Sequence, residues 1–380
     1  MIGAFAHLLA ALGSQSVDVF EWAEKDIRLK RLPNAPTWSA YAQSQPKMKF
    51  SGWQLAHAVV KADYLVERNF MLPGLALILQ LDQIIDFQSG GQLSLVPGSA
   101  VTLNDFTRTS LSGRLGQGLS LLFAQQRGYS FVGHLATDPD VLAKIKSLPG
   151  RRKKAADFLF ETPSMQRMIL ESKGSFSQTD NDPTKIKSVL RTALTSQVDY
   201  WMSRISPAAA KGFAVYSCFR ESAGSTPSAL IFVDPPGRLE QTPLELPEAW
   251  VRRRNYASWL QVMGLDRAAV SLRRDEIRDR AGIELPVIRI AGRRIAVSTL
   301  VKQPESGRWL GAGLDVAALK MISDALSGDE SGLLAYGLDT SPSLFDLVPA
   351  DKEFSIFPDG SFFGIFDANS DYEFNDVFLL

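Results

Sequence analysis

One stretch of this sequence, residues 157–173, constrains the fold more than any other, and it reads DFLFETPSMQRMILESK. Two short apolar runs in it are separated by Thr-Pro-Ser at 162–164, residues that favour a turn. This pattern predicts a β-hairpin, because short apolar runs bounded by turn residues are typical of paired strands. Asp157 begins the first run and Glu171 follows the second, so the hairpin would bring the two acids side by side.

The end of this stretch, Glu171-Ser172-Lys173, places two charges on one face of the expected strand. Side chains alternate along a strand, so Glu171 and Lys173 point one way and Ser172 points the other way. With Asp157 opposite, two carboxylates and an ammonium would share a small volume, which is the arrangement that divalent-metal phosphodiester chemistry uses. The alternative is a surface glutamate and lysine that close a strand and have no chemical role.

In the first of these hypotheses, Asp157 and Glu171 hold a magnesium ion, or manganese in its place. Such an ion polarises a phosphoryl oxygen and lowers the pKa of a bound water. Mg²⁺ prefers oxygen ligands and keeps several waters, so two carboxylates and a backbone carbonyl are a sufficient protein contribution. Lys173 would position the attacking hydroxide or stabilise the charge that grows on the phosphorane.

The elements expected around the hairpin follow a definite order. An apolar stripe at helical spacing precedes it, and Gly128 ends that helix as a left-handed C-cap. A long amphipathic helix follows the hairpin. The expected order is helix, strand, hairpin, helix, strand and strand, at residues 111–126, 129–135, 157–173, 185–205, 212–219 and 229–234.

The hairpin, its acids and this element order resemble the PD-(D/E)XK superfamily of restriction-endonuclease-like nucleases over residues 109–235. The resemblance implies an α/β fold, with a restriction-endonuclease-like mixed-sheet core flanked by helices. It also implies Mg²⁺-dependent hydrolysis of phosphodiester bonds, in DNA more than in RNA. The N- and C-terminal regions would then be α+β accessory regions that supply target recognition or subunit contacts. Ala156 stands where the family often has a proline before the first acid.

The resemblance implies parts for two glutamines as well. Many members of the family carry a glutamate on the first helix near the metal, and Gln117 stands in that place here. Several branches use a glutamine on the second helix with an aromatic residue after it, which Gln197 with Tyr200 or Trp201 matches. The alternatives are an ordinary helix residue at 117 and a core glutamine with satisfied hydrogen bonds at 197. On a regular strand Glu161 would share the face of Asp157, which makes it a reserve ligand.

Two basic clusters are candidates for contact with nucleic acid. The chain has 41 Lys and Arg against 41 Asp and Glu, so no global field attracts a polyanion and local clusters must do so. Arg151, Arg152, Lys153 and Lys154 precede Asp157 closely and are expected to contact phosphates, with a solvated loop as the alternative. The second cluster, residues 252–254, is expected on the exposed side of a helix at 250–263, where a merely solvated face is the commoner explanation.

The length of the chain and its proline- and glycine-containing breaks predict three regions. A chain of 380 residues suggests two or three domains. We expect an N-terminal accessory domain at 1–105, the nuclease-like core at 106–236 and a C-terminal accessory α+β domain at 237–380. In the first region we expect helices at 5–12, 17–32 and 51–68 and strands at 75–81 and 93–96. In the last we expect, besides the helix at 250–263, a helix at 316–326 and hairpins at 287–297 and 354–366.

Composition excludes several classes of protein. A single cysteine, Cys218, rules out an internal disulfide framework and agrees with a reducing compartment. It lies in an expected strand, so a buried inert thiol is favoured over a nucleophile. Three scattered histidines argue against a structural zinc site. We find no targeting segment, and the most apolar stretch, 72–85, is too short to span a bilayer, so we expect a soluble, cytoplasmic protein.

These observations leave three hypotheses about function. The leading one is a metal-dependent nuclease acting on DNA. The second is a catalytically inactive protein of the same fold that binds nucleic acid or acts as an assembly subunit, a hypothesis favoured by the glutamine at 117 in place of an acid. The third, compatible with either, is a subunit of a prokaryotic anti-phage defence complex, by fold-level analogy. A homo-oligomer or a partner subunit is compatible with each.

Overall fold

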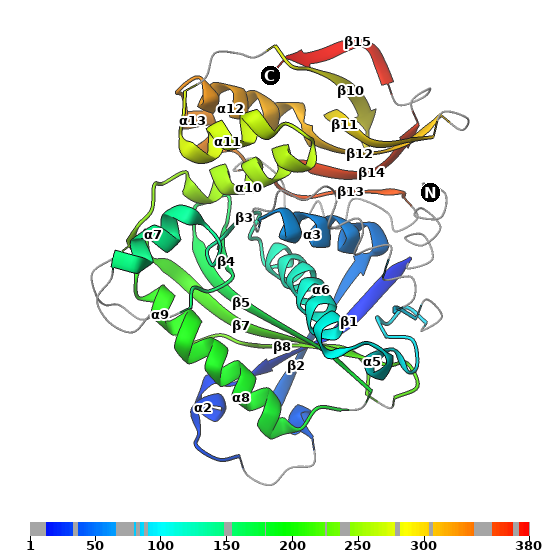
Figure 1. Cartoon of the computed structure of the whole chain (residues 1–380), viewed down its shortest axis with the longest axis vertical. Coiled ribbons are helices and arrows are strands. Elements are labelled where there is room, and N and C mark those ends of the chain that lie inside the picture. The colour runs from blue at the N-terminus through cyan, green and yellow to red at the C-terminus, as the bar shows by residue number, and fades with distance from the viewer. Residues whose placement is uncertain are drawn as a thin grey trace.

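A computed structural model describes residues 13–32, 37–65, 80, 84–86, 90–147, 154–178, 180–224, 226–235, 244–277, 282–303, 307–337, 352–367 and 372–379. Most strands of this part of the chain form two sheets, each accompanied by helices (Figure 1). The expected α/β class is confirmed, because the larger sheet is mixed and has helices on both faces. Within these residues, none of the helices combines the length and apolar character of a membrane-spanning segment.

The larger sheet has seven strands in a mixed arrangement. Two neighbouring pairs are parallel, β1 with β8 and β5 with β7, and the other four pairs are antiparallel. Its core strands are apolar on both faces, as expected for a sheet covered by helices on each side. The strand order is β2 (Ala42–Ser51), β1 (Ser14–Trp22), β8 (Ala229–Val233), β7 (Ala209–Arg220), β5 (Arg167–Ser177), β4 (Phe158–Glu161) and β3 (Phe131–His134).

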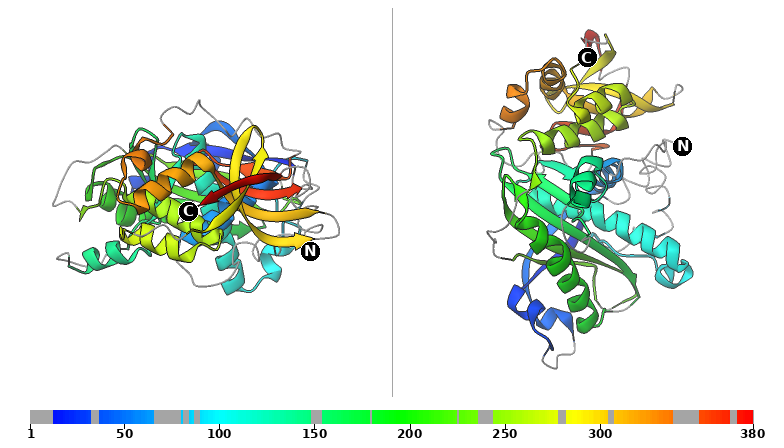
Figure 2. Two further views of the ribbon diagram at one scale, coloured as in Figure 1. Left: turned by 90° about the horizontal axis from the view of Figure 1, so that it is seen from above. Right: turned by 60° about the vertical axis from the view of Figure 1, so that its left-hand side comes forward.

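Two helical layers cover this sheet, and Figure 2 shows α6 and α8 on opposite sides of its strands. On one face lies α6 (Asp105–Gln126), whose Phe123 ring packs against Phe213 of β7 at 5.6 Å between centroids. On the other face run α8 (Pro183–Ala193), a single π-type turn η2 (Leu194–Val198) and α9 (Asp199–Met202). A Cβ on Gly212, the residue of β7 that precedes Phe213, would lie 2.2 Å from Met202 Sδ, which shows how closely this second layer packs.

The local sequence explains where these helices begin and end. The Asn104 side chain accepts a hydrogen bond from Thr107 N at the start of α6, and Gly128 adopts a left-handed φ of 87° just beyond its end, as expected. Asp182 caps α8 through Thr184 N, with Pro183 in the first turn. The elements expected at 111–126, 129–135, 157–173, 185–205, 212–219 and 229–234 are therefore found in the expected order.

The N-terminal region departs from the expectation. The helix expected at 17–32 is present only at 24–28, as α2, and the expectation is wrong for the first part of this range, where β1 pairs with β8 and β2. Its sequence SQSVDVFEW buries Val17, Val19 and Trp22 in near alternation, which is a strand pattern. The helix expected at 51–68 is confirmed as α3 (Gly52–Leu65), which packs on α6 and has a nearly all-buried surface.

The strands β1 and β2 lie within the region expected as an N-terminal domain at 1–105. They nevertheless belong to the same sheet as the strands of the expected core at 106–236. Of the other N-terminal expectations, the helix at 5–12 and, apart from residue 80, the strand at 75–81 lie outside the described residues. The strand expected at 93–96 is limited to isolated bridges at Leu95. The remaining short elements around the large sheet are α2 (Glu24–Arg28), η1 (Trp38–Ala40), α5 (Ser99–Thr102), α7 (Pro139–Ser147), β6 (Ile205–Ser206) and β9 (Leu244–Glu245).

The second sheet is antiparallel and, with α11, α12 and α13, forms what we call the C-terminal unit. Both expected hairpins are confirmed, and Ala291 and Gly292 take positive φ values of 48° and 74° in the turn of the first. The helix expected at 316–326 is also confirmed. The strand order is β13 (Phe354–Ile356), β14 (Ser361–Asp367), β12 (Arg308–Asp315), β11 (Arg293–Gln303), β10 (Glu284–Ile290) and β15 (Tyr372–Leu379). The helices are α11 (Asp266–Arg274), α12 (Val316–Leu326) and α13 (Ser331–Ala335).

Helix α10 (Trp250–Val262) lies between the two sheets and covers the β3 edge of the larger one (Figure 1). Beside it, the fully buried Lys61 of α3 forms an ion pair with Asp359 in the β13–β14 turn. Asn255 of α10 donates to the same carboxylate at 2.7 Å. Tyr256 donates to the Asp359 carbonyl at 3.0 Å. Buried polar groups are costly without partners, so this network ties the C-terminal unit to the helices of the large sheet in one arrangement.

Candidate functional site

Asp157 and Glu171 face each other where β4 and β5 stop pairing. The last ladder pair on that side is Phe158 with Leu170, so the two acids occupy the next opposed positions. Glu171 Oε2 accepts the Asp157 backbone N–H at 3.0 Å, and Asp157 Oδ2 accepts the Ser172 backbone N–H at 2.9 Å. Each acid is thus oriented by the backbone of the other strand. The structure brings together the two acids that the sequence singled out.

The two acids lie in a place that resists their ionisation. Burial, and after it the Asp157 carboxylate, raises the pKa of Glu171 to about 7, while Lys173 opposes the rise. Burial also raises the pKa of Asp157, against the opposing effects of Lys173 and of the Ser172 N–H. Two like charges so close in a site of low polarity titrate as a pair and not as two independent groups. A cation placed beside the two acids therefore stabilises their charged forms.

Lys173 supplies one such cation from the protein itself. Its ammonium contacts Glu171 Oε1, and 38% of its side chain is exposed, whereas the Glu171 side chain is fully buried. Ser172 between them points to the other face, where its hydroxyl lies 2.9 Å from the Ser120 hydroxyl of α6. The alternation expected for residues 171–173 is thus present. Lys173 links the buried Glu171 carboxylate to the solvent.

Helix α6 approaches β5 closely, but on the face opposite to the acid pair. A Cβ on Gly174 would lie 2.0 Å from the Ser112 carbonyl oxygen, and one on Gly116 would lie 3.3 Å from Gly174 Cα. Gly174 and Ser172 face α6, so Glu171 and Lys173 face the α8–α9 layer. Gln117 is part-buried on α6, and within the described residues we find no hydrogen bond from it to either acid. The structure does not bring Gln117 to the pair.

Gln197 reaches the segment just before Asp157, not the carboxylates. Its Nε2 donates to the Ala155 carbonyl at 3.0 Å, and Trp201 Nε1 donates to the Lys154 carbonyl at 3.1 Å. Gln197 is buried within the π-type turn, a feature often found at functional sites. The two side chains fix the strand entry that carries Asp157. Gln197 is therefore a hydrogen-bonded core residue that can position the first acid.

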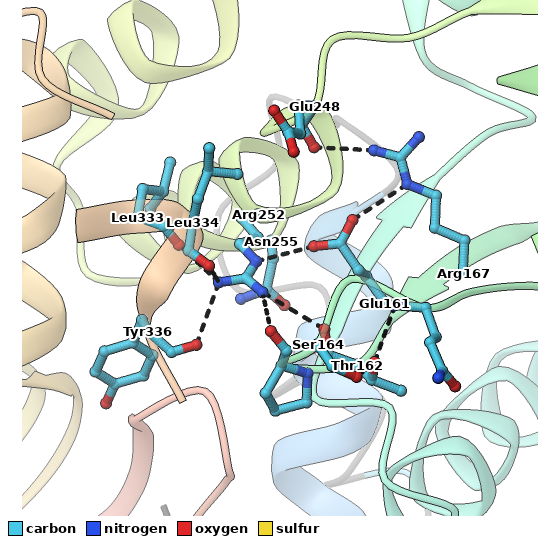
Figure 3. Close-up of polar contacts among 12 residues, drawn as sticks. Glu161, Thr162, Ser164, Arg167, Glu248, Arg252, Asn255, Leu333, Leu334 and Tyr336 are labelled. Atoms are coloured by element: carbon cyan, nitrogen blue, oxygen red, sulfur yellow. Dashed lines mark hydrogen bonds and ion pairs between the residues drawn. The ribbon is translucent and has the colours of Figure 1, made fainter. Parts of the chain in front are cut away.

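Glu161 is not a reserve ligand, and this expectation is wrong. It is fully buried at the far end of β4, where its carboxylate accepts from Arg252 Nε at 2.8 Å and from Arg167 Nε at 3.2 Å (Figure 3). Both of its oxygens are therefore already engaged by guanidinium groups. Alternation placed it on the face of Asp157, but its distance along the strand gives it different partners.

The expectation that residues 252–254 form an exposed basic face is also wrong. The three arginines are 0%, 5% and 5% exposed, respectively, and each has acidic partners. Arg253 pairs with Asp275 and Glu330, and Arg254 pairs with Asp138 at 2.5 Å and Asp140 at 2.7 Å. Consecutive helix residues are about 100° apart, so three of them cover most of the circumference and cannot share one face. Helix α10 is enclosed between the two sheets, which buries all three.

The other basic cluster is described only in part. Lys154 has an exposed side chain close to Asp157 in the chain, whereas Arg151, Arg152 and Lys153 lie outside the described residues.

Cys218 is buried and free, and burial raises its pKa to about 12, so it is not a nucleophile. Sequence reasoning missed the roles of Arg167 and Arg252 as partners of Glu161. No local signal could assign that role to Arg252, because it meets Glu161 across 91 positions of sequence. Arg167 is opposite Glu161 in the hairpin register, so a cross-strand charge pair was the local signal that could have identified it.

The donor set for a metal is small. Among the described residues, no three His, Cys, Asp or Glu side chains gather as a metal-binding group. Asp157 and Glu171 would be the two carboxylate ligands, with water completing the shell, which is a common arrangement for Mg²⁺. Comparison with protein-family models, with curated proteins and with solved structures finds no match for this chain.

Proposed function

We propose that this chain is a metal-dependent nuclease of the PD-(D/E)XK type that hydrolyses phosphodiester bonds of DNA. The observation that supports it most is the facing pair Asp157 and Glu171, each held by the other's strand, with Lys173 bonded to one of them. The element order α6, β3, β4, β5, α8–α9 and β7 supports it as well, with β3, β4, β5 and β7 adjacent in that order. The acid pair and the element order are the two parts of the sequence pattern that resemble the family.

The acid pair fits a divalent cation chemically. Two carboxylates whose pKa values are raised by burial and by each other are stabilised by a nearby positive charge, and oxygen is the donor that Mg²⁺ and Mn²⁺ accept. When bound, such an ion polarises a phosphoryl oxygen and lowers the pKa of a coordinated water. Cation binding would displace protons from the pair, so affinity should rise as the pH rises through the titration range.

The chain's own residues would divide the remaining work. Lys173, with its ammonium at the exposed side of the pair, would move from Glu171 to a phosphate oxygen and stabilise charge there. Gln197 and Trp201 would keep Asp157 in place through the carbonyls of residues 154 and 155. Lys154 and the cations at 151–153 would contact the DNA backbone, which is sequence-independent electrostatic binding. The buried thiol of Cys218 is compatible with a reducing compartment such as the cytoplasm.

The test is cleavage of linear, circular and single-stranded DNA with Mg²⁺ or Mn²⁺ by wild type and three variants. Asp157→Asn, Glu171→Ala and Lys173→Ala should each lower the rate by at least about 100-fold, because each removes a group that acts on the developing charge or its metal. Lys185→Ala is the matched control, since Lys185 is an exposed lysine on α8 outside the site. Variants that cut as fast as wild type would place the active site elsewhere. Mn²⁺ calorimetry measures binding without requiring turnover.

A second candidate is a binding or assembly protein of the same fold without turnover, including one that serves in an anti-phage complex. The observation that favours it is the poor donor set. Gln117 stands on the other side of the sheet, the described residues offer two acids at the site, and Glu171 is already bonded to Lys173. A wild-type protein that binds DNA in Ca²⁺ but cuts no substrate in Mg²⁺ or Mn²⁺, with or without its natural partners, would support this candidate.

A further inference from the structure

The α10 segment 252–255 connects the strands of the acid pair to the C-terminal unit. Arg252 bonds to β4, and Asn255 Oδ1 accepts from Val132 N of β3 at 3.2 Å. Arg254 bonds to Asp138 and Asp140 at the start of α7. Every one of these contacts is made from a buried helix between the two sheets. The segment that resembled a nucleic-acid-binding face is therefore an internal junction.

Arg252 makes the most extensive of these junctions (Figure 3). Its Nε donates to Glu161 Oε1 at 2.8 Å and one terminal nitrogen donates to the Pro163 carbonyl at 2.7 Å, both in the β4–β5 hairpin. The other terminal nitrogen donates to the carbonyls of Leu333 at 2.8 Å and Leu334 at 2.6 Å, at the end of α13. A guanidinium has a rigid planar fork of donors, so these contacts set the hairpin and α13 in a defined relation.

The β4–β5 hairpin connects the residues that Arg252 contacts with the acid pair. Glu161 is the last residue of β4 and is paired in register with Arg167, the first residue of β5. Asp157 and Glu171 are the opposed positions just beyond the other end of the same short ladder. The two ends are four residues apart on each strand, about 13 Å at a rise of about 3.3 Å per residue. Because the ladder is short, a displacement at Glu161 changes the alignment of the acids.

We propose that Arg252 is a positioning residue for the Asp157–Glu171 pair, through which the C-terminal unit sets the geometry of the site. The functional part of this proposal rests on the proposed function of the pair. The physical reason is that Arg252 holds Glu161 and the hairpin turn from outside the large sheet. Without the guanidinium, Glu161 keeps Arg167 as its sole ion-pair partner in the described part of the chain, and the carbonyls at 163, 333 and 334 no longer share one donor group.

The chain offers a matched control in Arg253. It lies next to Arg252 on α10, is nearly as buried, and also forms ion pairs with carboxylates. Those partners, Asp275 and Glu330, belong to the α11 and α13 segments of the C-terminal unit, and its further bond goes to the Leu272 carbonyl of α11. Arg253→Met thus disturbs the C-terminal unit and global stability but leaves the β4–β5 hairpin contacts in place.

The experiment is amide hydrogen exchange in Arg252→Met and Arg253→Met, read at the N–H groups of Asp157 and Ser172. These two amides make the reciprocal bonds to the acid pair, so their protection reports its geometry without needing metal or cleavage. Exchange at both should be at least about 10-fold faster in Arg252→Met than in Arg253→Met at equal global stability, adjusted with urea. Mn²⁺ affinity, measured by calorimetry, should fall in the same order.

Arg252→Lys is the second variant, for the case that Arg252→Met does not fold. A lysine keeps the charge beside Glu161 but cannot span the three groups that the guanidinium joins, so it should also speed exchange at both amides. Equal exchange in the residue-252 and residue-253 variants would overturn the proposal. If wild-type protein neither binds Mn²⁺ nor cuts DNA while the exchange difference is present, the positioning role stands and the nuclease proposal fails.

Discussion

Replacing Glu171 with Gln should stabilise the metal-free protein at alkaline pH, although it removes a proposed catalytic group. The wild-type carboxyl has an ordinary pKa of 4.5 when unfolded, and burial together with the Asp157 carboxylate raises the pKa to about 7 in the folded chain. The charged form is therefore less stable in the fold than in water. An amide of the same shape can still accept the Asp157 N–H, and it carries no charge to bury.

The sign and size follow from proton linkage. Between the unfolded pKa of 4.5 and the folded pKa of about 7, the folded chain binds a proton that the unfolded chain has released, so stability falls as the pH rises through that window. At about 1.4 kcal/mol per pKa unit, the loss is about 3 kcal/mol once the pH exceeds the folded pKa. The Gln variant lacks this loss. It should gain up to about 3 kcal/mol over wild type near pH 8 and little near pH 4.

Urea unfolding in EDTA at several pH values measures this difference. The control is Glu161→Gln at the opposite end of the same β4–β5 ladder, where the carboxylate is equally buried but bonded to Arg167 and Arg252. That change leaves buried guanidinium groups without their acid and should cost about 3–5 kcal/mol. The test is that near pH 8 Glu171→Gln should raise the free energy of unfolding, whereas Glu161→Gln should lower it. If Glu171→Gln is as destabilising near pH 8 as near pH 4, Glu171 is stable as an anion beside Lys173 and the reasoning fails.

Three further predictions test other parts of the molecule. Replacing Arg151 to Lys154 with Ser should weaken DNA binding, measured in Ca²⁺. The slope of the logarithm of the binding constant against the logarithm of the salt concentration should become shallower by about 0.9 for each phosphate that is no longer neutralised. An unchanged slope would reject this cluster as a phosphate-binding site. Lys61→Met should lower the free energy of unfolding in urea by about 3–5 kcal/mol, because the buried Asp359 carboxylate loses the Lys61 ammonium. Adding Asp359→Asn should recover much of this free energy. Burial raises the pKa of Cys218 to about 12. A thiol reagent near pH 8 should therefore modify Cys218 in urea and not in the native protein. Rapid labelling of the native protein would show that this strand is exposed.

The candidate site was predictable where its signal is local. Asp157, the turn at 162–164 and Glu171 lie within one hairpin, so alternation and turn chemistry place the two acids together and Lys173 beside them. Gln197 could be singled out as a polar residue on an apolar stripe, but its partner could not. Its hydrogen bond to the Ala155 carbonyl crosses 42 positions of sequence, and no periodicity encodes such a contact.

The sequence by itself determined the local elements, because caps, turns and apolar periods act over a few residues: the capped helix α6, the β4–β5 hairpin and the two C-terminal hairpins follow from these. Only the tertiary structure decided which charges are available to a ligand. Glu161 and residues 252–254 are polar in sequence, yet they are buried because segments distant in the chain enclose them and supply opposite charges. Likewise β1 is a strand of the large sheet because β8, more than 200 residues later, offers it an unpaired edge. Burial and ion pairing depend on which segments meet, and that is a property of the whole packed chain.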